Sequence, residues 1–261
     1  MIVAITGAAR GIGLATAKAF KAKGATVVIG DIDEEAVRKA AEEHGLKGVR
    51  LDVTDRASFE AFLAEAGDYR VLVNNAGIMP IGSILDESDA DARRCIDINV
   101  HGVMLGTKLA LAKFVPEGRG HVVNVGSIAG ILPTPGLALY NGSKGAVVMF
   151  TEAARQEVAK HGVQVSAVLP TFTNTELVAG TRSPKGQKNA EPEDIAQAIV
   201  KIIAKPRPRV TVPAKFGAQL KLASLLPQAV QDRLNARLGL DTIFLDFDES
   251  ARKGYDARIR S

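Results

Sequence analysis

The chain has 261 residues, of which 46% are hydrophobic and 24% charged; this globular composition argues against disorder, collagen and coiled coil. Cys95 is the single cysteine, which excludes an intrachain disulfide and a cysteine-based zinc site; we expect no metal. The net charge of +4 originates in residues 205–261, where eleven Lys/Arg are spread among six Asp/Glu with few aromatic residues, so we do not expect nucleic-acid binding.

Short β-branched runs alternate with helix-like segments along most of the chain. The predicted strands are residues 2–6, 26–30, 48–52, 70–74, 121–126, 163–169 and 209–213. The predicted helices cover residues 12–23, 33–44, 55–66, 89–113, 137–160 and 192–204. Apolar strands that alternate with helices are typical of a parallel sheet covered on both faces, so we predict a doubly wound α/β fold.

The N-terminal residues run directly into the first predicted strand. They lack the charged and apolar regions of a secretion signal. No apolar run approaches the roughly 18 residues that indicate a membrane span. We therefore expect a cytoplasmic protein.

A glycine-rich loop, TGAARGIG at 6–13, connects the first strand to the first helix. Gly7 suits a tight turn, Gly11 lets the backbone approach a phosphate, and Gly13 lets the helix pack closely on the strand. Ile12 opens the helix, whose free N–H groups favour an anion. The spacing is Gly-x3-Gly-x-Gly, and the alternative is a glycine-rich turn without a ligand.

Asp31 ends the second strand, 18 residues after Gly13. A carboxylate at this position accepts both ribose hydroxyls of NAD and repels the 2′-phosphate of NADP. Arg10 favours the opposite choice, because a guanidinium pairs with that phosphate. Since Arg10 can swing aside, we predict NAD in preference to NADP. The alternative for Asp31 is a helix cap, which Asp33 could provide instead.

Further candidates follow the next two strands. Asp52 and Val53 offer adenine one polar acceptor and one apolar wall. Asn75, Ala76 and Gly77 belong to NNAG, in which amide side chains bridge backbone groups and small residues leave room for a flat ring. Ligands of doubly wound folds bind at these carboxyl ends of the strands.

Four later residues are candidates for chemistry: Asn99, Ser127, Tyr140 and Lys144. Tyr140 and Lys144 share a face if 137–160 is helical, and a nearby cation would lower the pKa of Tyr140 from about 10 toward neutrality. Ser127 could hold a substrate oxygen, and Asn99 could position a water for proton transfer. The alternatives are a turn serine at Ser127 and an asparagine that caps a bend at Asn99.

TGAARGIG, NNAG, Asn99, Ser127 and the Tyr140–Lys144 pair, in this order, closely resemble the classical short-chain dehydrogenases/reductases over residues 1 to about 212. The resemblance implies a seven-stranded Rossmann sheet, a homodimer or homotetramer, and hydride transfer between a nicotinamide and a carbonyl or secondary alcohol. It also implies that Tyr140 is the general acid/base, that Lys144 lowers its pKa and holds the nicotinamide ribose, that Ser127 orients the substrate and that Asn99 supports a proton relay.

One motif departs from the family pattern. After the sixth strand the family usually has Pro-Gly, whereas this chain has Pro170-Thr171. By resemblance, Thr173 still lies where the backbone meets the nicotinamide carboxamide, and Thr175 where a hydroxyl reaches the cofactor. We expect Pro170 and Thr173 to contact the cofactor along a backbone path that the missing glycine alters.

The chain divides into a predicted catalytic domain, residues 1–213, and a helical extension, residues 214–261. Residues 171–190 are polar and aperiodic, which predicts a substrate loop. In the extension, Val230, Leu234 and Leu238 recur every four residues, which predicts an amphipathic helix. Three readings of the extension stay open: a lid over an apolar pocket, a subunit interface, or a membrane-surface helix, which is the less favoured.

The sequence predicts an NAD-dependent dehydrogenase or ketone reductase of a hydrophobic secondary alcohol, lipid-, steroid- or retinoid-like by resemblance of the extension to some members of the family. Two alternatives are an NADPH-dependent 3-oxoacyl reductase and a dinucleotide sensor without catalysis. A sensor is expected to have lost Tyr140, Lys144 or Ser127, all of which are present.

Overall fold

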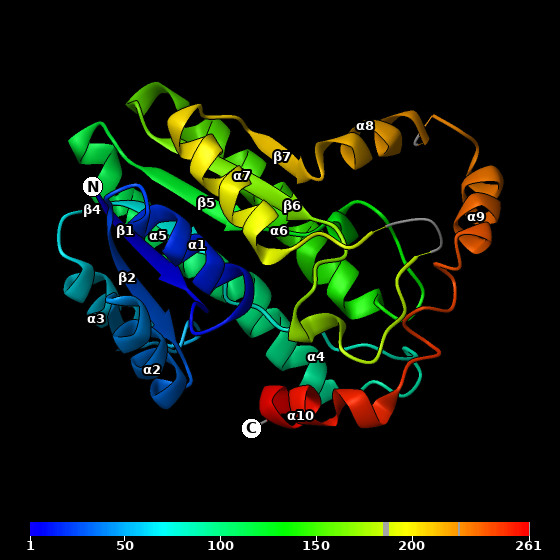
Figure 1. The fold of residues 1–261 in the computed structure, drawn as a ribbon. Coiled ribbons are helices and arrows are strands. Elements are labelled where there is room, and N and C mark those ends of the chain that lie inside the picture. Colours follow the sequence, from blue (N-terminus) through cyan, green and yellow to red (C-terminus); the bar gives the residue numbers. More distant parts are fainter. Residues whose placement is uncertain (185–187, 224, 261) are drawn as a thin grey trace.

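A computed structural model of the chain describes residues 1–184, 188–223 and 225–260. Its centre is a seven-stranded parallel sheet with the order β3-β2-β1-β4-β5-β6-β7 (Figure 1). The strands are β1 (Ile2–Thr6), β2 (Thr26–Asp31), β3 (Lys47–Arg50), β4 (Tyr69–Asn74), β5 (His121–Val125), β6 (Gln164–Pro170) and β7 (Arg209–Val212). The predicted Rossmann-type sheet is confirmed, and the strand ends differ from prediction by at most two residues.

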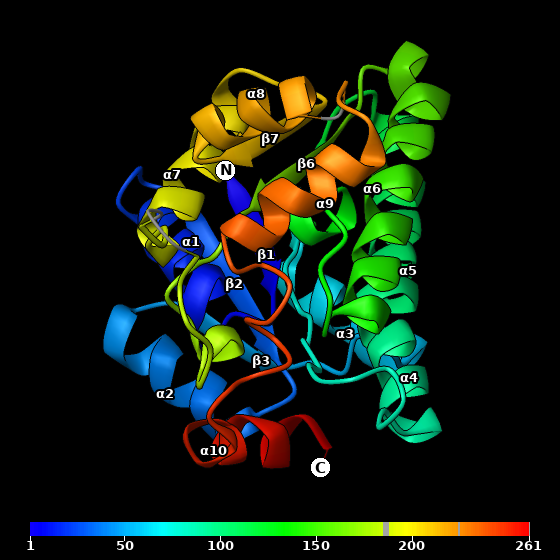
Figure 2. The ribbon, with the colours of Figure 1, turned by 90° about the vertical axis from the view of Figure 1, so that its right-hand side faces the viewer.

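Helices cover both faces of the sheet because its strands are apolar on both sides (Figures 1 and 2). One face carries α1 (Gly11–Lys21), α2 (Glu34–His44) and α7 (Pro192–Ala204); the other carries α3 (Arg56–Ala66), α5 (Gly102–Glu117) and α6 (Ala138–Val158). Phe20 and Ile199 lie in the first core, and Phe59 and Phe114 in the second. The two cores hold the strand ends, and hence the site, in fixed register.

The helices begin where the sequence provides caps. The Asp33 carboxylate accepts the N–H of Ala36 at 3.0 Å at the start of α2. At the start of α7, Glu191 and Asp194 form a capping box, and Pro192 occupies the first turn between them. Asp33, and not Asp31, therefore caps α2, which leaves the Asp31 carboxylate available for another role.

The predicted helix over 89–113 is interrupted. The structure has α4 (Asp89–Ile96), one π-helical turn, η1 (Asp97–His101), and then α5, which continues to Glu117. A π-turn inserts an extra residue into the helical ladder and often marks a functional site. Here it carries Asn99, whose side chain is fully buried.

The extension is helical, as predicted, but its parts differ. It comprises α8 (Ala214–Ala223), α9 (Gln228–Arg237) and α10 (Glu249–Arg260). Val230, Leu234 and Leu238 remain 38%, 40% and 43% exposed, so this stripe does not pack on the body of the chain. The charged end forms α10, which lies beside α4 (Figure 1).

The predicted substrate loop over 171–190 holds one short 3₁₀ turn, η4 (Glu176–Val178), and a bridge between Thr173 and Ala190. Residues 185–187 of this predicted loop lie outside the described residues. Among the described helices, none has both the length and the apolar character that a membrane crossing requires.

Candidate active site

A cavity of about 1220 Å³ opens at the carboxyl ends of the strands. It brings together fifteen of the residues predicted from the sequence. These are Gly7, Arg10, Gly11, Ile12, Asp31, Asp52, Val53, Asn75, Ala76, Gly77, Ser127, Tyr140, Lys144, Pro170 and Thr173. Gly13 and Asn99 do not line the cavity but lie directly behind its wall.

The glycine loop has the close packing predicted for a phosphate cradle. Gly7 has φ +60° and Gly11 has φ +55°, a region that favours glycine. A Cβ on Gly13 would lie 2.4 Å from the carbonyl oxygen of Gly7, so only glycine fits where α1 crosses the loop. Asn75 fastens the loop from β4, since its Nδ2 donates to the carbonyl oxygens of Thr6 at 3.0 Å and Gly7 at 2.8 Å.

Asp31 stands at the end of β2, tied to the glycine loop. Its Oδ2 accepts the N–H of Ala9 at 3.1 Å, and its Oδ1 accepts the N–H of Asp33 at 3.2 Å. The Arg10 guanidinium does not approach Asp31 but pairs with Asp33 at 2.5 Å. The N–H of Ala36 and this guanidinium hold the pKa of Asp33 below its usual range. Arg10 is thus held in place by a carboxylate.

Asp52 and Val53, which follow β3, and Gly77, which follows β4, line the cavity. The Oδ1 of Asp52 accepts the N–H of Thr54 at 2.9 Å and its hydroxyl at 2.7 Å. Val53 is buried beside it. A Cβ on Gly77 would lie 3.1 Å from Oδ1 of Asn99 and 3.4 Å from Nζ of Lys144, so a small residue is needed at that point.

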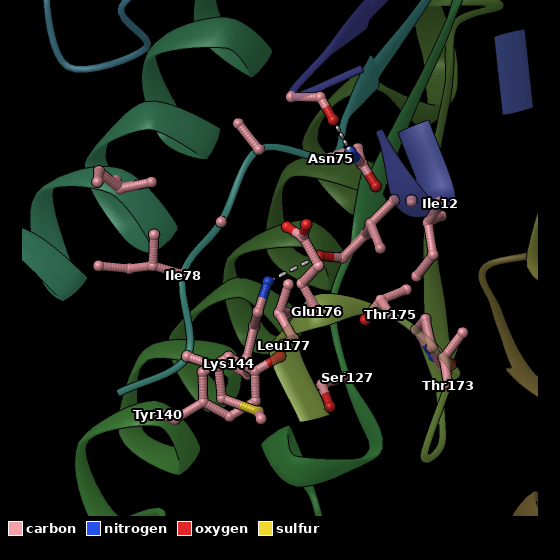
Figure 3. A pocket seen from close by; sticks show the side chains of 18 of the residues that line it. Ile12, Asn75, Ile78, Ser127, Tyr140, Lys144, Thr173, Thr175, Glu176 and Leu177 are labelled. Atoms are coloured by element: carbon pink, nitrogen blue, oxygen red, sulfur yellow. Dashed lines mark hydrogen bonds between the residues drawn. The ribbon is translucent and has the colours of Figure 1, made fainter. Parts of the chain in front are cut away.

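Tyr140 and Lys144 project from the first turns of α6, with Ser127 across from them (Figure 3). Lys144 Nζ lies 5.7 Å from the centre of the Tyr140 ring and donates to the carbonyl oxygen of Val125 at 3.1 Å. Ser127 caps the 3₁₀ turn η2 (Ile128–Gly130), where its Oγ accepts the N–H of Ala129 at 3.1 Å. The Ser127 hydroxyl also acts on the pKa of the Tyr140 phenol, which it lowers.

Burial changes the charge balance that the sequence predicted for this pair. The pKa of Tyr140 lies above its usual range because burial disfavours the phenolate; the hydrogen bond from Ser127 lowers it only in part. Burial also lowers the pKa of Lys144 to about 8. The expected fall of the Tyr140 pKa toward neutrality is therefore wrong for this structure, and Tyr140 is a protonated phenol at neutral pH.

Asn99 links the π-turn to both neighbouring segments. Its Oδ1 accepts the N–H of Ile78 at 2.8 Å, and its Nδ2 donates to the carbonyl oxygen of Ile78 at 2.9 Å and to Oγ of Ser143 at 3.0 Å. With its side chain occupied in this way, Asn99 positions the NNAG segment against α6. The Asn99 side chain therefore bridges Ile78 and Ser143. At the position where the sequence offered a capped bend as the alternative, the structure has the π-turn η1.

The segment after β6 passes the cavity without a glycine. No described non-glycine residue has a positive φ, so Thr171 follows an ordinary backbone path. Its Oγ1 is buried without a hydrogen-bond partner in the described part of the chain. Thr173 donates its hydroxyl to the carbonyl oxygen of Thr171 at 2.9 Å. Thr175 lies beside Gly11, since a Cβ on that glycine would approach its Cγ2 to 3.6 Å.

A family model described as short chain dehydrogenase matches residues 1–186, which is most of the chain. The chain belongs to the short-chain dehydrogenase family. The matched part therefore forms a short-chain dehydrogenase domain.

Two curated relatives show how far the likeness of this short-chain dehydrogenase extends. Cis-4-hydroxycyclohexanecarboxylate dehydrogenase of Sinomonas cyclohexanicum is 40% identical over 217 residues, which are 76% of this chain and 87% of that protein. The "Probable oxidoreductase EphD" of Mycobacterium tuberculosis is 34% identical over 266 residues, 91% of this chain. The chain spans only 45% of the length of EphD.

Two solved structures share the fold. A short-chain dehydrogenase/reductase from Burkholderia phymatum in complex with NAD has a TM-score of 0.78 at 26% identity and covers 85% of this chain and 92% of its own. A 3-ketoacyl-(acyl-carrier-protein) reductase from Brucella melitensis complexed with NADH has a TM-score of 0.73 at 30% identity, with 81% and 96% covered.

The residues of this short-chain dehydrogenase fit a dinucleotide. The glycine loop is a cradle that a Cβ would fill, because a Cβ on Gly7 would lie 2.6 Å from the Cα of Ala76. Thr171, whose buried Oγ1 has no hydrogen-bond partner in the described part of the chain, also lines this cavity. A bound dinucleotide would supply the hydride chemistry, while Asp31, the loop and Lys144 would hold it.

The part of the cavity around Tyr140 is apolar, and the extension contributes to it. Leu240, Ile243 and Phe244 pack with Met79 and Leu137 around Tyr140. The Phe244 ring stacks on Phe172 of the 171–190 segment, with the ring centres 5.5 Å apart and the planes at 19°. Of the three readings of the extension, the lid over an apolar pocket is the one that these contacts favour for residues 240–244.

Three residues of α10 were missed in the sequence: Arg252, Tyr255 and Arg258. Tyr255 and Arg258 line the cavity, and Arg252 is fully buried behind it. The Tyr255 hydroxyl accepts the N–H of Met79 at 2.8 Å. Arg252, Tyr255 and Ile259 follow one another at spacings of three and four, a helical face that could have revealed them within the charged end.

Proposed function

We propose that the protein catalyses NAD-dependent interconversion of a hydrophobic secondary alcohol and its ketone. The observation that carries this proposal is the single cavity shared by Asp31, the glycine loop and the Ser127–Tyr140–Lys144 group. A dinucleotide held by the first two would place its reactive end toward the third. The full set of acid/base groups supports an enzyme over a dinucleotide sensor.

The protonated state of Tyr140 indicates how it would act. A buried phenol donates its proton to a carbonyl oxygen during ketone reduction, and the hydrogen bond from Ser127 stabilises the charge that develops on the phenol oxygen. The reverse reaction needs the phenolate, which a charged Lys144 favours. Lys144, whose pKa burial lowers to about 8, is charged at neutral pH and is held in place by its hydrogen bond to the carbonyl oxygen of Val125.

The apolar substrate end supports a hydrophobic substrate. Phe172, Phe244 and Leu240 leave few polar partners for a charged substrate near Tyr140. The curated relative named for cis-4-hydroxycyclohexanecarboxylate makes cyclic secondary alcohols the first class to test. The structural relative named as a 3-ketoacyl reductase keeps a 3-oxoacyl thioester as the competing substrate.

A substrate panel tests this proposal directly. We expect kcat/KM, followed by NADH absorbance with both cofactors, to rise from small alcohols to cyclohexanol derivatives, steroids, retinoids and long-chain secondary alcohols. Phe244→Ala should lower kcat/KM for the best apolar substrate by about 10- to 100-fold, because one buried aromatic wall is lost. Leu245→Ala is the matched control, since Leu245 is 47% exposed.

Selectivity for a 3-oxoacyl thioester over every free alcohol or ketone would contradict the hydrophobic-alcohol proposal and favour the 3-oxoacyl reductase. An unchanged ranking of substrates in Phe244→Ala would remove the extension from the substrate pocket.

Cofactor choice is tested at Asp31. We expect Asp31→Ala to lower the NAD/NADP ratio of kcat/KM by about 10- to 100-fold, because charge-assisted hydrogen bonds to the ribose are lost and repulsion of a 2′-phosphate disappears. Asp33→Asn is the informative partner variant. It preserves a helix-capping side chain but loses the charge that holds Arg10, so we expect NADP use to rise while NAD use stays near the wild-type level.

An unchanged ratio in Asp31→Ala would refute the role of Asp31 in cofactor choice. Preference of the wild type for NADP would contradict the NAD assignment without affecting the dehydrogenase proposal.

A further inference from the structure

Helix α10 contributes Tyr255, Arg258 and Ile259 to the lining of the cavity and is fastened at both ends. At its first turns, the buried Arg252 donates to the carbonyl oxygens of Met79 and of Leu177, the latter at 2.6 Å. At its last turn, Arg94 of α4 donates to the carbonyl oxygen of Ile259 at 3.2 Å. α10 therefore bridges the 171–190 segment and α4 (Figures 1 and 2).

Arg258 lies on this helix and lines the cavity together with two acidic residues, Glu176 and Asp33. It forms an ion pair with Glu176 of η4, and its guanidinium carbon is 5.5 Å from the centre of the Tyr255 ring. Its charge also reaches Asp33, where it adds to the larger effects of Ala36 and Arg10 in holding the pKa of that carboxyl low. Arg258 therefore lies within electrostatic reach of the Arg10–Asp33 pair at the glycine loop.

Arg258, Glu176 and the glycine loop line the same cavity. The loop and the start of α1 offer backbone N–H groups to a phosphate. A guanidinium offers a planar fork of donors that matches two phosphate oxygens. Because α10 is held at both ends, the entropy cost of placing this side chain over an anion is reduced.

We propose that Arg258 binds the pyrophosphate of the dinucleotide, so that α10 closes the cofactor groove over the glycine loop. The proposal rests on the dinucleotide binding proposed above. Glu176, whose side chain is 56% exposed, competes with the pyrophosphate for the guanidinium and swings toward solvent when the anion binds.

This competition predicts effects of opposite sign at the two partners. We expect Arg258→Gln to weaken binding of NADH and of ADP-ribose by about 10- to 100-fold, because a charge-assisted contact is lost. Glu176→Gln should tighten both by several-fold, since the guanidinium is then freed of its competing charge. Adenosine lacks the pyrophosphate, so its affinity should change less than about twofold in either variant.

Isothermal titration calorimetry measures the dissociation constants of NADH and ADP-ribose. The affinity for adenosine is measured by its competition with ADP-ribose in the same titrations. Lys253→Gln is the matched control, because it removes one positive charge from an exposed position of the same helix. A loss in Arg258→Gln of less than twofold for ADP-ribose, or an equal loss for adenosine, would overturn the proposal. Should Arg258→Gln fail to fold, weaker ADP-ribose binding by Glu176→Gln would overturn it independently.

Failure of the wild type to bind either NADH or ADP-ribose would instead contradict the proposed function itself. The two results are thus distinguishable in one set of titrations.

Discussion

Tyr140→Phe should lower kcat by about 10³-fold or more while NADH still binds with near wild-type affinity. The substitution removes one hydroxyl from a side chain that is 6% exposed and leaves the ring in place. General acid/base groups contribute about 10²- to 10⁴-fold, and the Ser127 hydroxyl would lose its phenol partner at the same time. Stopped-flow single-turnover kinetics, with NADH binding measured separately by fluorescence, check both parts.

The matched control is Tyr69→Phe. Tyr69 is also a buried phenol, 3% exposed, but it packs against Phe114 in the core between the sheet and α5. We expect its kcat to stay within about twofold of the wild type. Near-normal turnover in Tyr140→Phe would exclude Tyr140 as the proton donor, and NADH binding without any turnover in the wild type would favour the sensor.

The cofactor side of the cavity was predictable because its signals are local. Each candidate there follows directly after a strand, and parallel strands place their carboxyl ends at one edge. The glycine loop, Asp31 and NNAG therefore share a cavity as soon as the strand order is right. Asp31 at the end of β2 and Asn75 just past β4 then hydrogen-bond to the loop from either side of β1.

The electrostatics of Tyr140 could not be read from the sequence. A spacing of four residues correctly places Lys144 on the same side of α6, but it does not report how far water is excluded. Tyr140 is buried by segments that are distant from it in sequence, including those of Met79 and Phe244. Because desolvation acts on both groups, it outweighs the attraction that the pair alone would predict.

The role of α10 was hidden for a related reason. Arg252 reaches the carbonyl oxygen of Met79 across 173 residues of sequence and that of Leu177 across 75. Within the charged end such an arginine looks like one more solvated cation. Only the fold shows that its charge is buried against backbone carbonyls and that α10 lies against the cavity.

Arg252→Met should release α10 from the body while the sheet stays folded. The substitution keeps much of the side-chain volume but leaves the carbonyl oxygens of Met79 and Leu177 without their donor, and Asp256, 3.0 Å from Nε, without its counter-ion. Removing one partner from a buried charged group costs about 3–5 kcal/mol. Since about 1.4 kcal/mol corresponds to a factor of ten, local opening of α10 should become at least about 10²-fold more frequent.

Chymotrypsin detects this opening because Tyr255 is buried in the closed helix and Arg252→Met leaves its cleavage site unchanged. In the regime where cleavage follows the population of the open form, the rate at Tyr255 should rise by the same factor. Lys253→Met is the control, because Lys253 lies next to Arg252 in the same helix but is exposed. Arg252→Lys should give an intermediate cleavage rate, because one ammonium cannot reach all the acceptors of a guanidinium. An unchanged rate in Arg252→Met would show that α10 is held without Arg252. If Arg258 binds the pyrophosphate, ADP-ribose should stabilise the closed position of α10 and lower the raised cleavage rate of Arg252→Met. This measurement therefore tests the anchoring of α10 by Arg252 and the binding of the pyrophosphate by Arg258 together.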